Sequence, residues 1–211
     1  MLIDMTMLIL LIVLMSYFTV KTQTHEILGF ITIILFGMHL FLNRQWFTTL
    51  KNGKRSFRKF AYWIVNILLI ITLFFVIISS LMISDYVFSF LSIKTSHIGR
   101  IMHLISTSWL FILISIHIGL HFNVICYRLN KRIKQSQFKY IIYFILFIWY
   151  IYGIIAFKNV KLWIDMFVIN EFKFFDYNIS PFLIYFRYLS IVYFISMTCY
   201  IISRKMKITK K

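Results

Sequence analysis

Four histidines in this chain of 211 residues form two pairs of equal spacing. His25 and His39 are 14 residues apart, and so are His103 and His117. Each pair lies in an apolar stretch that is long enough to cross a membrane as a helix. Fourteen residues of an α-helix return to within roughly 40° of the starting face and rise roughly 21 Å. Each helix is therefore expected to present two imidazoles on one face, one near each membrane surface.

Imidazole pairs of this kind are suited to haem iron. One ring nitrogen ligates the metal, while the other N–H is fixed by a neighbouring carbonyl or hydroxyl group. Two imidazoles fill both axial positions of the iron, which leaves no site for oxygen or substrate and favours electron transfer. Two such helices side by side would supply two sites stacked across the membrane, as a transmembrane b-type cytochrome requires. Zinc is a weaker alternative, because a site with two histidines lacks ligands.

Two further histidines and one arginine are candidates for supporting roles. His121 follows His117 by one turn, but it lies 18 residues from His103, a rise of about 27 Å that does not match the other helix. We therefore expect His117 to be the inner ligand and His121 to lie near the inner haem propionates or on a proton route. His121 as the inner ligand is the alternative. Arg100 is expected to pair with an outer propionate, and His97 to be an interfacial residue or to contact a quinone or a partner.

The composition indicates an integral membrane protein. The chain is 61% hydrophobic, with a mean hydropathy of +0.86, whereas soluble domains are about 45–50% apolar. One transmembrane domain over residues 1–211 would use nearly the whole length, leaving no room for a soluble catalytic domain. The net charge of +17 is interpreted as a topology signal and not as nucleic-acid binding, because the basic residues lie in short loops between apolar stretches.

Six apolar stretches predict an all-α fold with six transmembrane helices in membrane lipid. Their approximate bounds are 5–20, 25–42, 60–83, 97–126, 140–157 and 182–203. The second to fifth stretches form two helical hairpins of similar design. We expect these hairpins to assemble into a four-helix haem-binding core over about 25–157, because cofactor sites in bundles lie between facing helices. The helices at 1–20 and 182–203 are expected to be peripheral.

The distribution of charge predicts the orientation. Sixteen of the 23 Lys and Arg residues follow the second, fourth and sixth apolar stretches, and five of the six acids fall on the opposite side. By the positive-inside rule, both termini are expected in the cytoplasm. The two histidine-bearing helices then run in the same direction. This pairs His25 with His103 toward the outside (the outer pair) and His39 with His117 toward the inside (the inner pair).

The segments HEILGFITIILFGMHLFLNRQW and HLISTSWLFILISIHIGLH resemble the flavinylation-associated cytochromes, a family of small bacterial membrane proteins. The family pattern is roughly H-E-x-x-G…H-L-x-L-N-x-x-W, followed by H…H-x-G-L-H. The resemblance extends over the second to fourth apolar stretches. The chain departs from the pattern at HFNVI, where many relatives place a tryptophan near His121. It is also similar, more distantly, to cytochrome b561-like and ferric-reductase-like haem domains.

The resemblance implies a subunit of the bacterial cytoplasmic membrane with two non-covalent haem b groups. The axial ligands would be His25, His39, His103 and His117. Electrons would pass from a quinol or a cytoplasmic donor to an extracytoplasmic protein that carries covalently attached flavin. The sequence has no Gly-rich phosphate-binding loop, so any substrate-reducing domain of an oxidoreductase system would be a separate protein. The alternative is a non-haem transporter or proton-coupled subunit whose histidines carry protons.

Overall fold

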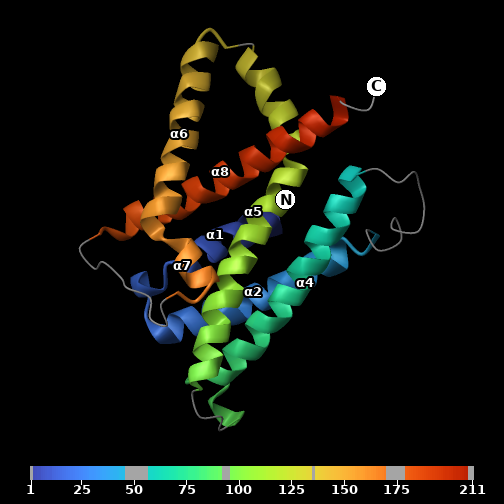
Figure 1. Ribbon diagram of the computed structural model, residues 1–211. Helices are drawn as coiled ribbons and strands as arrows, with labels where there is room; N and C mark the ends of the chain where they lie inside the picture. The colour runs from blue at the N-terminus through green and yellow to red at the C-terminus, as the bar shows by residue number, and fades with distance from the viewer. Residues whose placement is uncertain (1, 46–56, 92–95, 135, 170–178, 209–211) are drawn as a thin grey trace.

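All regular structure in the computed structural model is helical among the residues that it describes, which are 2–45, 57–91, 96–134, 136–169 and 179–208. The α-helices are α1 (Leu2–Met15), α2 (Thr22–Leu42), α4 (Phe57–Ile83), α5 (His97–Lys134), α6 (Lys139–Val160), α7 (Leu162–Met166) and α8 (Pro181–Ile208) (Figure 1). Short 3-10 turns lie at Tyr17–Thr19 and Ser89–Leu91. The predicted all-α class is therefore confirmed.

Five helices, α2, α4, α5, α6 and α8, are long and apolar enough to cross a membrane. Helix α1 is also apolar but has only 14 residues. Its length of about 21 Å is less than the roughly 30 Å of a hydrocarbon core. The helices begin and end near the predicted bounds, except that α5 continues to Lys134. No Gly or Pro occurs between residues 120 and 134 to end it.

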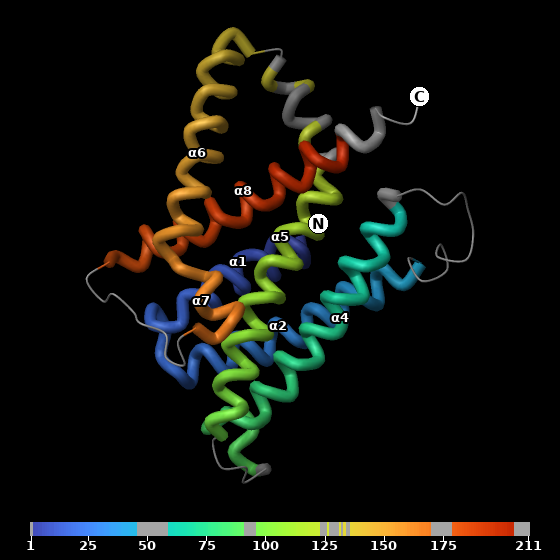
Figure 2. Tube along the Cα trace, in the orientation of Figure 1, coloured from blue at the N-terminus to red at the C-terminus, as the bar shows by residue number. Residues whose placement is uncertain are grey.

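Helices α4 and α5 pack as an antiparallel pair along most of the length of α4 (Figures 1 and 2). Asn66, early in α4, contacts His117 in the second half of α5. Ser79, late in α4, contacts His103 near the start of α5. Buried leucines fill the interface between these two contacts: Leu69, Leu110 and Leu113. This pairing places polar side chains of α4 beside both histidines of α5.

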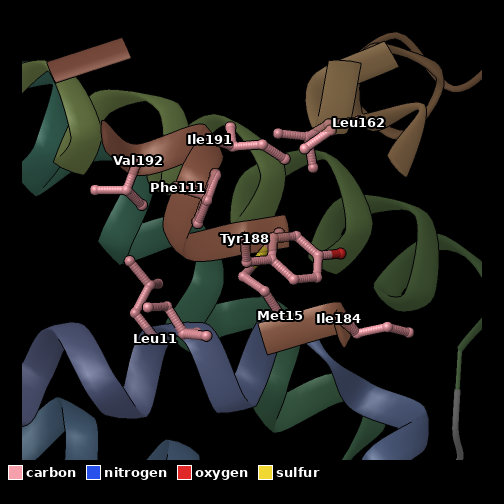
Figure 3. Close-up of a cluster of buried hydrophobic side chains, with 10 residues drawn as sticks. Leu11, Met15, Phe111, Leu162, Ile184, Tyr188, Ile191 and Val192 are labelled. Atoms are coloured by element: carbon pink, nitrogen blue, oxygen red, sulfur yellow. The ribbon is translucent and has the colours of Figure 1, made fainter. Parts of the chain in front are cut away.

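Helix α8 runs parallel to α5 and contributes most to the main buried core. Phe111 contacts Tyr188, and farther along both helices Phe122 contacts Tyr200. Helix α8 also packs against α6 and touches α1. The core draws on five helices (Figure 3): Leu11, Ile12, Met15, Phe111, Ala156, Leu162, Ile184, Tyr188, Ile191 and Val192.

The packing differs from the expected four-helix core over 25–157 with peripheral helices at 1–20 and 182–203. Helix α8 provides four of the ten core residues and α1 provides three, whereas α6 packs mainly against α8. Small residues explain the close approach of α8. A Cβ atom on Gly119 would lie 2.6 Å from the carbonyl oxygen of Ser196, and one on Gly153 would lie 2.5 Å from that of Ser190. Such residues let helix backbones approach closely within a membrane.

Candidate functional site

Helix α2 presents both of its histidines on a partly covered face. The partly buried positions on this face recur with the helical period: His25, Gly29, Thr32, Phe36 and His39. The opposite face is exposed and apolar: Ile27, Ile31, Ile34 and Met38. No residue of α2 is fully buried by the described part of the chain. A Cβ atom on Gly29 would meet no atom within 4 Å, so there is space beside this face.

Glu26 connects helix α2 to the end of α4 through hydrogen bonds. Its carboxylate accepts a hydrogen bond from Ser84 Oγ at 2.6 Å, and others from the backbone N–H groups of Asp85, Tyr86 and Val87 at 2.9–3.0 Å. The close backbone packing of α2 in the described structure is with α1. Because Glu26 is next to His25, its hydrogen bonds fix the position of His25 relative to α4 and α5.

Both residues of the outer pair lie near the end of α4. His25 of α2 and His103 of α5 are close enough for their rings to interact electrostatically. The Nδ1 atom of His103 lies 3.2 Å from Ser79 Oγ and 3.5 Å from Ser80 Oγ. The buried Nδ1 atom of His25 has no hydrogen-bond partner among the described residues. The ring of Tyr17 packs edge-on against His25, with 4.9 Å between ring centroids.

The inner pair lies toward the other end of α2 and near the middle of α5. His39 of α2 and His117 of α5 also interact electrostatically. The Nδ1 atom of His39 lies 2.8 Å from Asp4 Oδ1 of α1. The Nδ1 atom of His117 lies 2.9 Å from Asn66 Oδ1 of α4. Each inner histidine thus has an oxygen acceptor that a different neighbouring helix provides.

These hydrogen bonds determine which ring nitrogen could bind a metal. When Nδ1–H donates to an oxygen, the neutral imidazole carries its lone pair on Nε2. That arrangement holds for His39 and His117, whose partners are oxygen acceptors. It extends to His103 because Ser79 Oγ donates its own hydrogen to the carbonyl of Val76 and so accepts from Nδ1. Oriented imidazoles of this kind are typical of metal-binding sites, where the hydrogen-bond partner fixes both tautomer and ring direction.

The remaining predicted site residues lie around the two pairs. The ring centroid of His121 is 4.7 Å from that of His117 and 5.0 Å from that of Tyr62. The hydroxyl of Tyr62 donates a hydrogen bond to the carbonyl of Leu120, which anchors this aromatic contact. His121 is therefore adjacent to the inner pair. Arg100 and His97 are exposed in the first turns of α5, before the outer pair.

Asp4, Asn66, Ser79 and Ser80 were not among the residues predicted from the histidine spacing. The sequence does carry a signal for the partners on α4. Asn66 and the Ser79–Ser80 pair are 13–14 residues apart, which nearly repeats the spacing of the histidines that they contact. Asn66 is also the sole amide side chain in the apolar stretch 60–83.

Comparisons with protein-family models, with curated proteins and with solved structures find no match for this chain. They neither support nor contradict the resemblance to the flavinylation-associated cytochromes. The function therefore has to be argued from the histidine pairs and their surroundings.

Proposed function

We propose that this chain is a transmembrane b-type cytochrome that carries electrons across a membrane through two haem groups. The carrying observation is that the histidines of α2 and α5 lie in two pairs that interact electrostatically, one near the end of α4 and the other farther along α2 and α5. Three of them are oriented by a hydrogen bond at Nδ1. A haem held by two histidines would supply one-electron transfer, because it would leave no position at the iron for oxygen or a substrate.

The residues present fit such a group. His25 and His103 would hold one haem, and His39 and His117 the other. The Nδ1 atom of His25 has no hydrogen-bond partner among the described residues, so this ring could present either nitrogen to a metal. The space beside Gly29 would allow a flat macrocycle to approach α2.

The relative directions of the helices support the six-span topology that belongs to this proposal. Helices α2, α5 and α8 run the same way, since α2 pairs with α5 at both histidine sites and α8 lies parallel to α5. A basic segment lies at the C-terminal end of each of these three helices, in its last turns or just after them. The positive-inside rule then places these segments and both termini in the cytoplasm of a bacterium, with α1 as the sixth, short span.

The proposed partners follow from that orientation. A quinol or a cytoplasmic protein would donate electrons to the chain, and an extracytoplasmic protein with bound flavin would accept them. The described residues form no nucleotide-binding domain, and substrate chemistry would belong to the partner. The chain would therefore act as the membrane subunit of an oxidoreductase system.

Histidine variants test the proposal residue by residue. We expect His117→Ala to remove one of two b-type haems and to leave the other, because the outer pair is intact. His97→Ala is the matched control, since His97 is exposed at the start of the same helix, and this variant should keep both haems. The pyridine haemochrome of each purified variant, divided by protein concentration, gives the count. Equal haem content in the two variants would contradict the assignment of His117.

One observation favours a second candidate function, a proton-coupled membrane subunit. The Asp4 carboxylate contacts His39, which in turn interacts with His117, and carboxylates and imidazoles inside membranes often carry protons. Such a protein would show no Soret absorption band. It would instead move protons into vesicles along a pH gradient, and Asp4→Asn would slow that movement.

A further inference from the structure

The two histidine pairs differ in the acceptors that their Nδ1 atoms meet. In the inner pair the acceptors are the carboxylate oxygen of Asp4 at 2.8 Å and the amide oxygen of Asn66 at 2.9 Å. In the outer pair, His103 meets only hydroxyl oxygens at 3.2 Å and 3.5 Å. The Nδ1 atom of His25 has no partner among the described residues.

This difference changes how strongly each imidazole would donate electrons to a metal. A carboxylate that accepts the Nδ1–H bond raises the basicity of the ligand, and bonds to an ionised acceptor are roughly twice as strong as neutral ones. A more basic ligand stabilises the ferric over the ferrous state and lowers the reduction potential of a haem.

We infer that Asp4 and Asn66 give the inner haem site a lower reduction potential than the outer one, so that electrons run downhill from the inner to the outer pair. The inference rests on the proposed function and deepens it by naming the residues that would set the direction of electron flow. Asp4 acts as a positioning residue, because it touches His39 and not the iron. With haem bound at both sites, one electron would pass from the inner to the outer site with no bond made or broken. A quinol or a cytoplasmic donor replaces that electron, and an extracytoplasmic flavin accepts it.

The expected size of the effect follows from the exposure of the acceptor. The Asp4 side chain is 52% exposed and that of His39 is 26% exposed, so solvent screens part of the charge. We therefore expect removal of the Asp4 charge to change the ratio of reduced to oxidised inner haem by roughly tenfold at a fixed potential. A tenfold change in this ratio corresponds to a shift of about 59 mV in the reduction potential of a one-electron couple.

The test is a spectroelectrochemical titration of the purified full-length chain with its haems. Asp4→Asn keeps an oxygen that can accept the bond from His39 and removes only the charge. Asn66→Leu removes the second inner acceptor independently. Both variants should raise the potential of the inner haem and leave that of the outer haem unchanged. Asp85→Asn is the charge-matched control. It removes the same charge far from the inner pair, because Asp85 lies in the turn after α4, at the end of the molecule that carries the outer pair.

The two haems are assigned by the variants that remove their ligands, since His117→Ala retains only the outer one. Electron paramagnetic resonance of the oxidised protein gives a second readout, because a change in imidazole donation shifts the g-values of the inner haem alone. An inner potential equal to or above the outer one overturns the inference while leaving the cytochrome proposal intact. The same holds if neither Asp4→Asn nor Asn66→Leu moves the inner potential. A purified chain that binds no haem overturns both.

Discussion

Asn66 illustrates how the neighbours of a histidine decide what it can do. An amide inside an apolar transmembrane helix is costly unless it is hydrogen-bonded. The 2.9 Å contact between Asn66 Oδ1 and His117 Nδ1 satisfies both groups at once. It also leaves the lone pair of His117 on Nε2. Ser79 plays the corresponding part at His103.

Replacing Asn66 by leucine tests this contact through stability. We expect Asn66→Leu to lower the free energy of unfolding by about 1–3 kcal/mol, because Nδ1 of His117 loses its acceptor. Thr72→Val is the control on the same helix, since the Thr72 hydroxyl bonds to carbonyls of α4 itself. Its expected effect stays within about 0.5 kcal/mol. Thermal unfolding in detergent, followed by circular dichroism, measures both, and equal midpoints would refute the role of Asn66.

The pairing of the histidines could be predicted at this scale, but their partners could not. Equal spacing on two helices that run in the same direction leaves one sensible pairing, and the members of each pair lie at corresponding positions along α2 and α5. That they bind haem stays a prediction. The contact between Asp4 and His39 joins residues 35 apart in sequence. It depends on how α1 packs against α2, which no local pattern encodes.

At the scale of helices, the packing of α8 depends on residues without large side chains. Gly119 and Gly153 stand where α8 crosses α5 and α6. Ser196 Oγ also donates a hydrogen bond to the carbonyl of Ser115 across the first crossing, at 2.7 Å. Lipid is as apolar as a helix interface, so close backbone approach and polar contacts hold these helices together.

Alanine substitutions at glycine test this packing with opposite expected signs. Gly119→Ala should lower the unfolding midpoint, because the added Cβ would overlap the Ser196 carbonyl, at a cost of about 1–3 kcal/mol. Gly37→Ala is the control, since no atom lies within 4 Å of its added Cβ. Alanine should leave that midpoint unchanged or raise it, because it favours helix by about 0.5–1 kcal/mol over glycine. A lower midpoint for both variants would show that space at the crossing is not the cause.

The positions of the long helices could be predicted because hydropathy and length determine them. The neighbours of each helix could not, since an apolar stretch looks alike whether it faces lipid or another helix. This explains why α8 packs within the main core although its stretch gives no sign of it. The short helix α7 lies outside the six predicted stretches, because its five residues are too few for a periodic pattern.

For the whole molecule, the directions of the helices make the orientation testable. Asp85, after α4, and Gln137, before α6, are both exposed and fall on opposite sides of the proposed topology. In a background without Cys126 and Cys199, we expect an impermeant maleimide to label Asp85→Cys in cells from which the outer membrane has been removed. It should label Gln137→Cys only after the cells are opened. Labelling of the Gln137 variant in closed cells would contradict this orientation and the direction of electron flow that depends on it.

The most direct test of the central claim is the haem content of the purified chain. We predict two b-type haems per chain by pyridine haemochrome analysis, with the Soret and α bands of low-spin, bis-imidazole iron after reduction. Both should remain non-covalently bound, because the sequence has no C-x-x-C-H motif. A folded, helical preparation from haem-replete cells that shows no Soret band would contradict the cytochrome proposal.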